Sequence, residues 1–338
     1  MSDQVSSSHP TKRKRTGEET DAPPNDPPPV TRSSQFWFED GSVIIQAESI
    51  QYRVHRSVLS LHSTVLKDCF QIPQPDGEPT VDSCPVLHLS DSATDIEHLF
   101  CLFYALYDTH DLHKPIPFAI TSITIRLGRK YDLIRFVTDA MARLKHGFPN
   151  QLRKWDEVDL SEVFTETKGL LFDVINLAYE FSINSILPAA FLQLCQTYTL
   201  LEILQGEERD DKSMAVLSLQ ALQTCLVGRD KVVRALPRGI STFFIQDRAF
   251  QSPNCVQPAC PGEFLDILFF FTDEEPFLRI AFPGSDSPWD FKDFSDSDLC
   301  DDCVKKGELQ WTRFRIWLWN KLPLYFGSGP WSSLKDME

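Results

Sequence analysis

The sequence predicts an α+β protein in which a small β-sheet flanked by helices is followed by a helical extension and a cysteine-bearing C-terminal segment. Three observations support this prediction. Apolar residues alternate between positions 43 and 54, which is typical of a β-hairpin. Most apolar residues after position 56 recur instead at helical spacing. Two close pairs of cysteines lie in the last third of the chain.

The composition is that of a globular chain long enough for two domains. Of the 338 residues, 42% are hydrophobic and 24% charged, and 33 basic against 48 acidic side chains give a net charge of −15. Such a surface repels phosphate, so direct nucleic-acid binding is not expected. No apolar run is long enough for a membrane helix, and the amino terminus lacks the apolar core of a secretory signal. We expect an intracellular protein, nuclear or cytoplasmic, without a membrane partner.

Residues 1–35 are predicted to form a disordered tail. They contain six prolines and no aromatic residue, so they cannot bury enough apolar area to offset the entropy lost on ordering. Within this tail, Lys12, Arg13, Lys14 and Arg15 form a basic block of the kind that nuclear import receptors bind as an extended peptide. The block predicts a nuclear import signal, although short basic blocks also arise by chance.

The first folded domain is predicted to span residues 36–145. Apolar residues alternate through 43–47 and again through 50–54, and Ser63 and Ser92 each precede a helical pattern as potential caps. In chain order, the patterns predict a hairpin over 43–54, two helices within 56–70, a strand over 86–89, a helix over 96–104, and helices over about 120–133 and 136–144.

This domain resembles the BTB/POZ family. The resemblance is carried by the runs Asp40 to Ile45, Tyr52 to Leu59 and Ser63 to Phe70. The family shows an acidic residue before a hairpin, a histidine followed by a basic residue and a leucine, and then a serine with an aromatic residue ending the next helix. The strand over 86–89 and the helices that follow match the order of elements in the family. More particularly, the chain resembles the BTB-domain proteins of basidiomycete fungi.

The resemblance implies a protein-interaction module. It implies association through the domain, often as a homodimer that swaps or packs amino-terminal elements, and in some members the recruitment of a cullin scaffold for ubiquitin transfer. The candidate faces are the helices at 56–70 and the segment 36–45. Phe36, Trp37 and Phe38 are candidate partner-binding residues. They lie next to a disordered tail, at the edge of the folded domain, where aromatic side chains are least needed for the domain's own core. The alternative is that they fold back on their own domain.

Residues 146–235 are predicted to form a helical extension. Leu171, Val174, Ile175, Ala178 and Phe181 make one helical stripe, and a proline lies at a first-turn position of the next helix, where its missing N–H costs nothing. Part of this segment also resembles the helical extension of the fungal BTB proteins. We therefore expect a helical bundle packed against the first domain.

The C-terminal module, residues 236–338, holds the pattern Cys255-x4-Cys260 followed by Cys300-x2-Cys303. Two close thiol pairs can direct four sulfurs tetrahedrally onto Zn²⁺, and four protein ligands leave no position for a reactive water. The pattern therefore predicts a structural zinc site. The alternative is four unrelated reduced thiols packed as small apolar groups, because nine cysteines outside a secretory context are not expected to form a disulfide framework.

Two further features bear on function. A helical aromatic pattern from Trp311 to Leu322, ended by Pro323, predicts a buried C-terminal helix. No hydrolase, metalloprotease, phosphate-loop or dinucleotide signature is present, and the place of His55 in the BTB-like motif implies a structural role. We expect a non-enzymatic interaction module, acting by dimerisation or as an adaptor. The alternative is a nuclear transcriptional regulator or co-regulator with a structural zinc site.

Overall fold

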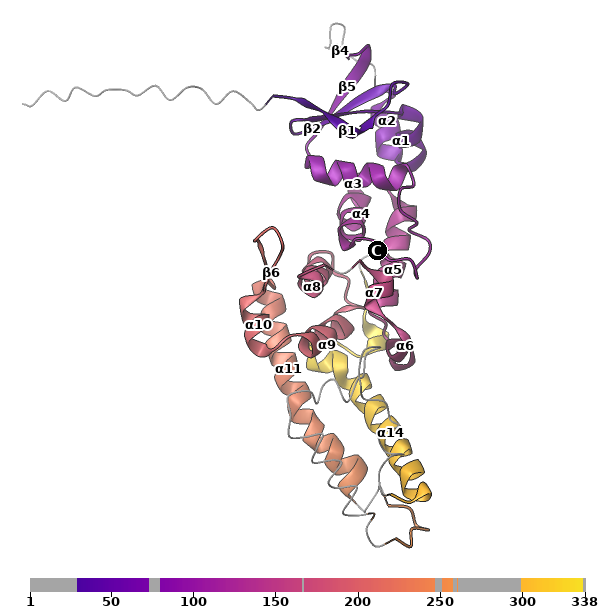
Figure 1. Ribbon diagram of the computed structural model, residues 1–338, viewed down its shortest axis with the longest axis vertical. Coiled ribbons are helices and arrows are strands. Elements are labelled where there is room, and N and C mark those ends of the chain that lie inside the picture. Colours follow the sequence, from indigo (N-terminus) through magenta and orange to yellow (C-terminus); the bar gives the residue numbers. More distant parts are fainter. Residues whose placement is uncertain are drawn as a thin grey trace, which may run out of the picture.

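The computed structural model describes residues 29–72, 80–165, 167–246, 251–257, 260 and 299–336. In this part of the chain the protein is an elongated α+β molecule, with a sheet at one end and two long helices at the other (Figure 1). The basic block Lys12 to Arg15 lies outside the described residues, so the import signal stays a prediction.

The predicted hairpin is confirmed as the centre of a five-stranded sheet with the strand order β1-β3-β2-β5-β4. Its strands are β1 (Thr31–Trp37), β2 (Val43–Ala47), β3 (Ile50–Val54), β4 (Thr80–Val81) and β5 (Cys84–Leu89). Strands β2 and β3 pair antiparallel with Ile45 opposite Tyr52, while β5 runs parallel to β2 and β1 runs parallel to β3. Val43, Ile45 and Ala47 are buried on one face of β2, as period-two patterning requires, and Ile44 on the other face is buried as well.

Order begins earlier than the sequence predicts, because residues 31–35 belong to β1 rather than to a disordered tail. The backbone N–H of Thr31 donates to the carbonyl of Ser49 at 2.7 Å, and the Arg32 guanidinium lies 4.3 Å from the centre of the Trp37 ring. The strand lies at the edge of the sheet and most of its side chains are exposed. Because an exposed edge strand carries polar side chains, the composition of this segment did not distinguish it from the tail.

Five helices complete the N-terminal unit: α1 (Arg56–His62), α2 (Thr64–Cys69), α3 (Ala93–Phe103), α4 (Phe118–Lys130) and α5 (Ile134–Gly147). The predicted caps are confirmed, since Ser63 accepts a hydrogen bond from the backbone of Leu66 and Ser92 from that of Asp95. The sheet packs on α3, where the buried Tyr52 hydroxyl donates to the carbonyl of Ala93 at 2.8 Å.

A second core begins at α4 and α5 and continues through the rest of the described chain. Its further elements are α6 (Leu152–Glu157), α7 (Leu160–Val163), α8 (Leu170–Glu180), α9 (Leu187–Thr197), α10 (Leu200–Gln205), β6 (Glu207–Glu208), β7 (Met214–Ala215), α11 (Leu219–Ile240), η1 (Ser241–Ile245), α14 (Asp301–Tyr325) and η4 (Trp331–Ser333). The predicted boundary at 235–236 falls inside α11. Helix α14 of the predicted C-terminal module packs on α11 and α9 of the predicted extension.

The end of α14 also differs from the prediction, since Pro323 lies inside the helix, which continues to Tyr325. A proline in a helix leaves the carbonyl four residues earlier without its N–H donor. Here that carbonyl belongs to Trp319, and it accepts a hydrogen bond at 2.9 Å from the indole N–H of Trp331. The indole thus replaces the lost donor, and the last turn of the helix can form.

Candidate metal centre

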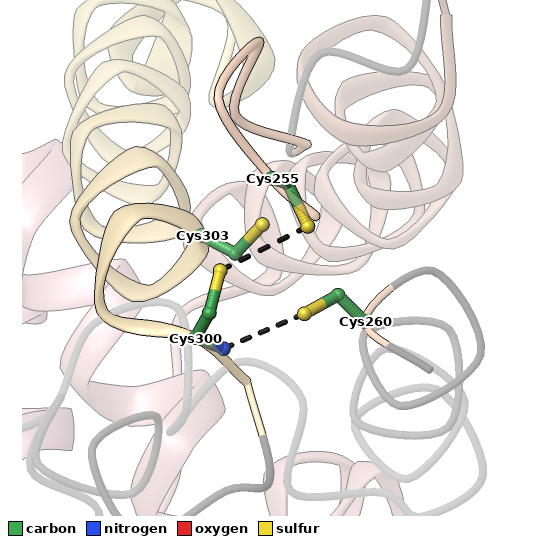
Figure 2. A group of neighbouring side chains, drawn as sticks. All are labelled: Cys255, Cys260, Cys300 and Cys303. Carbon is green, nitrogen blue, oxygen red and sulfur yellow. Dashed lines mark hydrogen bonds between the residues drawn. The ribbon is translucent and has the colours of Figure 1, made fainter. Parts of the chain in front are cut away.

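The four predicted ligands meet at the start of α14 (Figure 2). The Sγ atoms of Cys255, Cys260, Cys300 and Cys303 all lie within 4.8 Å of one another, and those of Cys255 and Cys300 are 3.8 Å apart. Cys260 and Cys303 are buried, while Cys255 and Cys300 are half-buried. The predicted convergence of the two cysteine pairs is therefore confirmed.

The spacing of these sulfurs fits a tetrahedral metal ion. Zinc binds thiolates at about 2.3 Å, which places sulfurs about 3.8 Å apart around a tetrahedron. Cys255 and Cys300 already stand at that separation, and the widest sulfur pair needs to close by about 1 Å. Four soft thiol donors favour zinc over calcium or magnesium, which prefer oxygen ligands.

The beginning of α14 explains how the second pair is aligned. Cys300 is the N-cap residue, and its carbonyl accepts the N–H groups of Cys303 and Val304 at 2.9 and 3.0 Å. One thiol therefore precedes the helix and the other lies in its first turn. The backbone N–H of Cys300 also donates to Sγ of Cys260 at 3.4 Å. This bond connects the two pairs across the 39 residues that separate them in the sequence.

The thiols of the cluster differ in acidity. The pKa of Cys255 is lowered to about 7, mainly because the Cys303 thiol donates a hydrogen bond to it. Burial raises the pKa of Cys303 to about 12 and also raises the pKa of Cys260. The metal-free cluster therefore stabilises a thiolate at Cys255 while the buried thiols keep their protons. A bound dication would replace those protons.

The aromatic run before the hairpin is placed differently from the prediction. Phe36 is 1% exposed and its ring centroid lies 5.5 Å from that of Phe100, so it folds back on its own domain, the alternative that the sequence left open. Phe38 is partly buried, with its ring centroid 4.9 Å from that of Tyr104. Trp37 is half-buried beneath an arginine. Phe36 therefore belongs to the apolar core of the N-terminal unit, and Phe38 is partly covered by that core.

His55 lies between the sheet and the helices, as a structural residue would. Its Nε2 is 3.1 Å from Oδ1 of Asp40, and its Nδ1 is 2.9 Å from the hydroxyl oxygen of Tyr104. The hydrogen bond with His55 lowers the pKa of Asp40. The BTB-like motif pointed to Asp40 and His55, but the sequence contained no signal that Tyr104, the residue directly after α3, would complete the group.

Comparisons with protein-family models, with curated proteins and with solved structures find no match to this chain. The interpretation therefore depends on the geometry itself. Among the residues that the structure describes, the four cysteines form the one group of three or more side chains arranged to hold a metal ion. In the same residues, no helix is both long and apolar enough to cross a membrane.

Proposed function

We propose that this chain is a non-enzymatic protein-interaction scaffold with a BTB/POZ-like N-terminal unit and one structural zinc ion held by Cys255, Cys260, Cys300 and Cys303. The observation that carries the zinc proposal is the meeting of four thiols within 4.8 Å of one another. Four protein ligands fill a tetrahedral zinc ion and leave no place for substrate. All nine cysteines are free thiols in the structure, and we propose that the protein acts in a reducing compartment inside the cell.

The zinc ion would cross-link two segments of the chain that are distant in the sequence. Residues 251–257, which carry Cys255, follow closely on α11 and η1, whereas Cys300 and Cys303 begin α14. Helices α11 and α14 pack on each other, so an ion bound to both segments would hold the far ends of this helix pair together. A site that forms only in the folded chain adds its metal-binding free energy to folding.

The order of elements supports the BTB/POZ proposal. A hairpin, two short helices, the strands β4 and β5, and three more helices follow one another in residues 43–147. Apart from the two-residue β4, this is the order that the sequence resemblance implies. The contacts of His55 with Asp40 and Tyr104 join the segment before the hairpin to α1 and α3.

An apolar surface supports binding of a second copy through α1 and α2. Leu61 is 78% exposed and Ile134 is 72% exposed. The two turns that carry them are held together, because the Ser63 hydroxyl donates to the carbonyl of Tyr131 at 2.6 Å. Val65, at the start of α2, is also exposed. We propose the surface formed by α1, α2 and the first turn of α5, which carries Ile134, as the dimer contact in place of the aromatic run. We call this surface the α1–α2 face.

Sedimentation velocity tests the dimer directly. We expect the zinc-loaded wild-type chain to dimerise, and the Leu61→Asn, Ile134→Asn double variant to have a dimer dissociation constant at least about tenfold higher, because hot-spot residues at the centre of an interface dominate affinity. The matched control is Val227→Asn on α11, which also replaces an exposed side chain. A wild-type chain that stays monomeric at high concentration would contradict the dimer and favour a cullin scaffold or another protein as the partner.

A second candidate function is a nuclear transcriptional co-regulator. The basic block from Lys12 to Arg15 and the zinc-type cluster favour it. The net charge of −15 opposes direct binding to DNA, so such a regulator would act through protein contacts.

A further inference from the structure

The helix α10 and the strand β7 carry a concentration of exposed apolar side chains. Six large apolar residues between positions 200 and 219 are 41% to 72% exposed: Leu200, Leu201, Leu204, Met214, Val216 and Leu219. We call these six residues the α10–β7 patch. Figure 1 shows α10 and the β6–β7 hairpin at the margin of the helical part, beside α9 and α11. Exposed apolar groups gathered in this way indicate an interaction surface.

The local geometry joins the two halves of the patch. In α10 the side chain of Ile203 is buried, and Leu201, two positions earlier, points to the opposite, outward side. Leu200 and Leu204 lie beside the buried face and remain exposed. At Gly206, where the chain leaves α10, a Cβ atom would lie 2.6 Å from Cγ1 of Val216. Ala215 is buried, so Met214 and Val216 face the other way, toward solvent. The outer face of β7 therefore continues from the end of α10.

Hydrogen bonds hold this surface in place without help from a partner. Thr199 and Glu202 form a capping box at the start of α10. Asn176 on α8 donates through its side chain to the carbonyl of Val216 and accepts from the backbone N–H of Ser218, each at 2.8 Å. A partner would thus bind a preformed surface and would not have to order it.

The charge around the patch selects the kind of partner. Residues 199–219 contain five acidic side chains, Glu202, Glu207, Glu208, Asp210 and Asp211, and two basic ones, Arg209 and Lys212. The resulting net charge of −3 opposes pairing of the patch with itself in a second copy, and it opposes an anionic membrane. It favours a cationic protein segment.

We propose that the α10–β7 patch binds an amphipathic segment of another protein, with an apolar face bordered by lysine or arginine residues. Helices with this pattern place their apolar residues three and four positions apart and dock them against exposed apolar surfaces. This proposal rests neither on the zinc site nor on the α1–α2 dimer, because the patch lies on other elements.

Fluorescence anisotropy with a defined probe tests the proposal. The probe is a labelled 18-residue peptide of leucine and lysine with the leucines at helical spacing, titrated with the full zinc-loaded chain. A peptide of the same composition in scrambled order controls for charge alone. We expect the wild-type chain to bind the patterned peptide with micromolar affinity and the scrambled peptide at least tenfold more weakly. The Leu201→Asn, Leu204→Asn variant should bind the patterned peptide at least tenfold more weakly than the wild type does. The Leu61→Asn, Ile134→Asn variant should bind as the wild type does.

A second variant, Met214→Gln with Val216→Thr, keeps the test valid if the first one folds poorly, and circular dichroism reports folding for both. Equal binding of patterned and scrambled peptides, or wild-type affinity in both patch variants, would overturn the proposal. It would also be overturned if the patch variants lost self-association, which would make a second copy the occupant. Loss of binding to phosphatidylcholine vesicles in the variants would assign the patch to a lipid surface instead.

Discussion

Replacing Cys303 with serine is expected to abolish tight zinc binding and to lower the stability of the chain. Cys303 is fully buried in the first turn of α14, so a serine there leaves three thiolates and a weaker oxygen donor. Loss of a supporting contact alone costs a metal site about 10- to 100-fold in affinity. We expect loss of a direct ligand to cost at least about 100-fold. A competition titration with a chromophoric chelator measures this change.

The same variant should lose the stabilisation that zinc provides. Chelation should lower the melting temperature of the wild-type chain, whereas the Cys303→Ser chain should melt at the same temperature with and without chelator. Cys69→Ser is the matched control, because Cys69 is an exposed thiol outside the cluster, and it should keep both zinc and stability. A Cys303→Ser chain that binds zinc as tightly as the wild type would show that these thiols are not a metal site.

The second large effect is expected at Gly228 on α11, which packs against Phe326, the residue that follows α14. A Cβ atom at this position would lie 2.0 Å from Cδ1 of Phe326, which is far inside van der Waals contact. Replacing a helical glycine with alanine ordinarily gains up to about 1 kcal/mol. Overpacking a buried contact costs about 1–3 kcal/mol. We expect Gly228→Ala to destabilise the chain by about 2 kcal/mol in urea unfolding.

Two controls separate overpacking from a general effect of alanine. At Gly147 the nearest atom to a new Cβ is a Leu160 methyl group at 3.1 Å, which can move, so Gly147→Ala should change stability by less than about 1 kcal/mol. Adding Phe326→Leu to Gly228→Ala should recover part of the loss, since the two sites are in contact. Equal effects at both glycines, or no recovery, would contradict close packing at Gly228.

The sequence was informative where one local pattern determines the structure. Alternation through Val43, Ile45 and Ala47 predicted the hairpin because one face of a strand must be buried. The spacing of the two cysteine pairs predicted that their four thiols converge, because each pair has the spacing of a metal-binding turn. In both cases the signal lies in residues a few positions apart, and the rest of the fold does not compete with it.

Features that depend on distant partners could not be predicted in this way. Thr31 and Arg32 pair with β3 at the start of β1, and the polar composition of residues 31–35 carries no sign of this pairing. Arg143 is 1% exposed, and its guanidinium donates to the carbonyls of Lys114 and Val163 at 3.0 and 2.9 Å. No periodicity identifies a buried arginine that binds backbone carbonyls. The helix past Pro323 likewise depends on a hydrogen bond from Trp331.

Native mass spectrometry of the full chain, recorded before and after denaturation in a chelator, tests the central claim most directly. One spectrum gives both the metal content and the subunit count. We predict one zinc ion per chain, lost after chelation, absent from the Cys303→Ser variant and present in the Cys69→Ser variant. A folded chain that binds no zinc after reconstitution with the metal would contradict the claim and leave Cys255, Cys260, Cys300 and Cys303 as reduced thiols packed together.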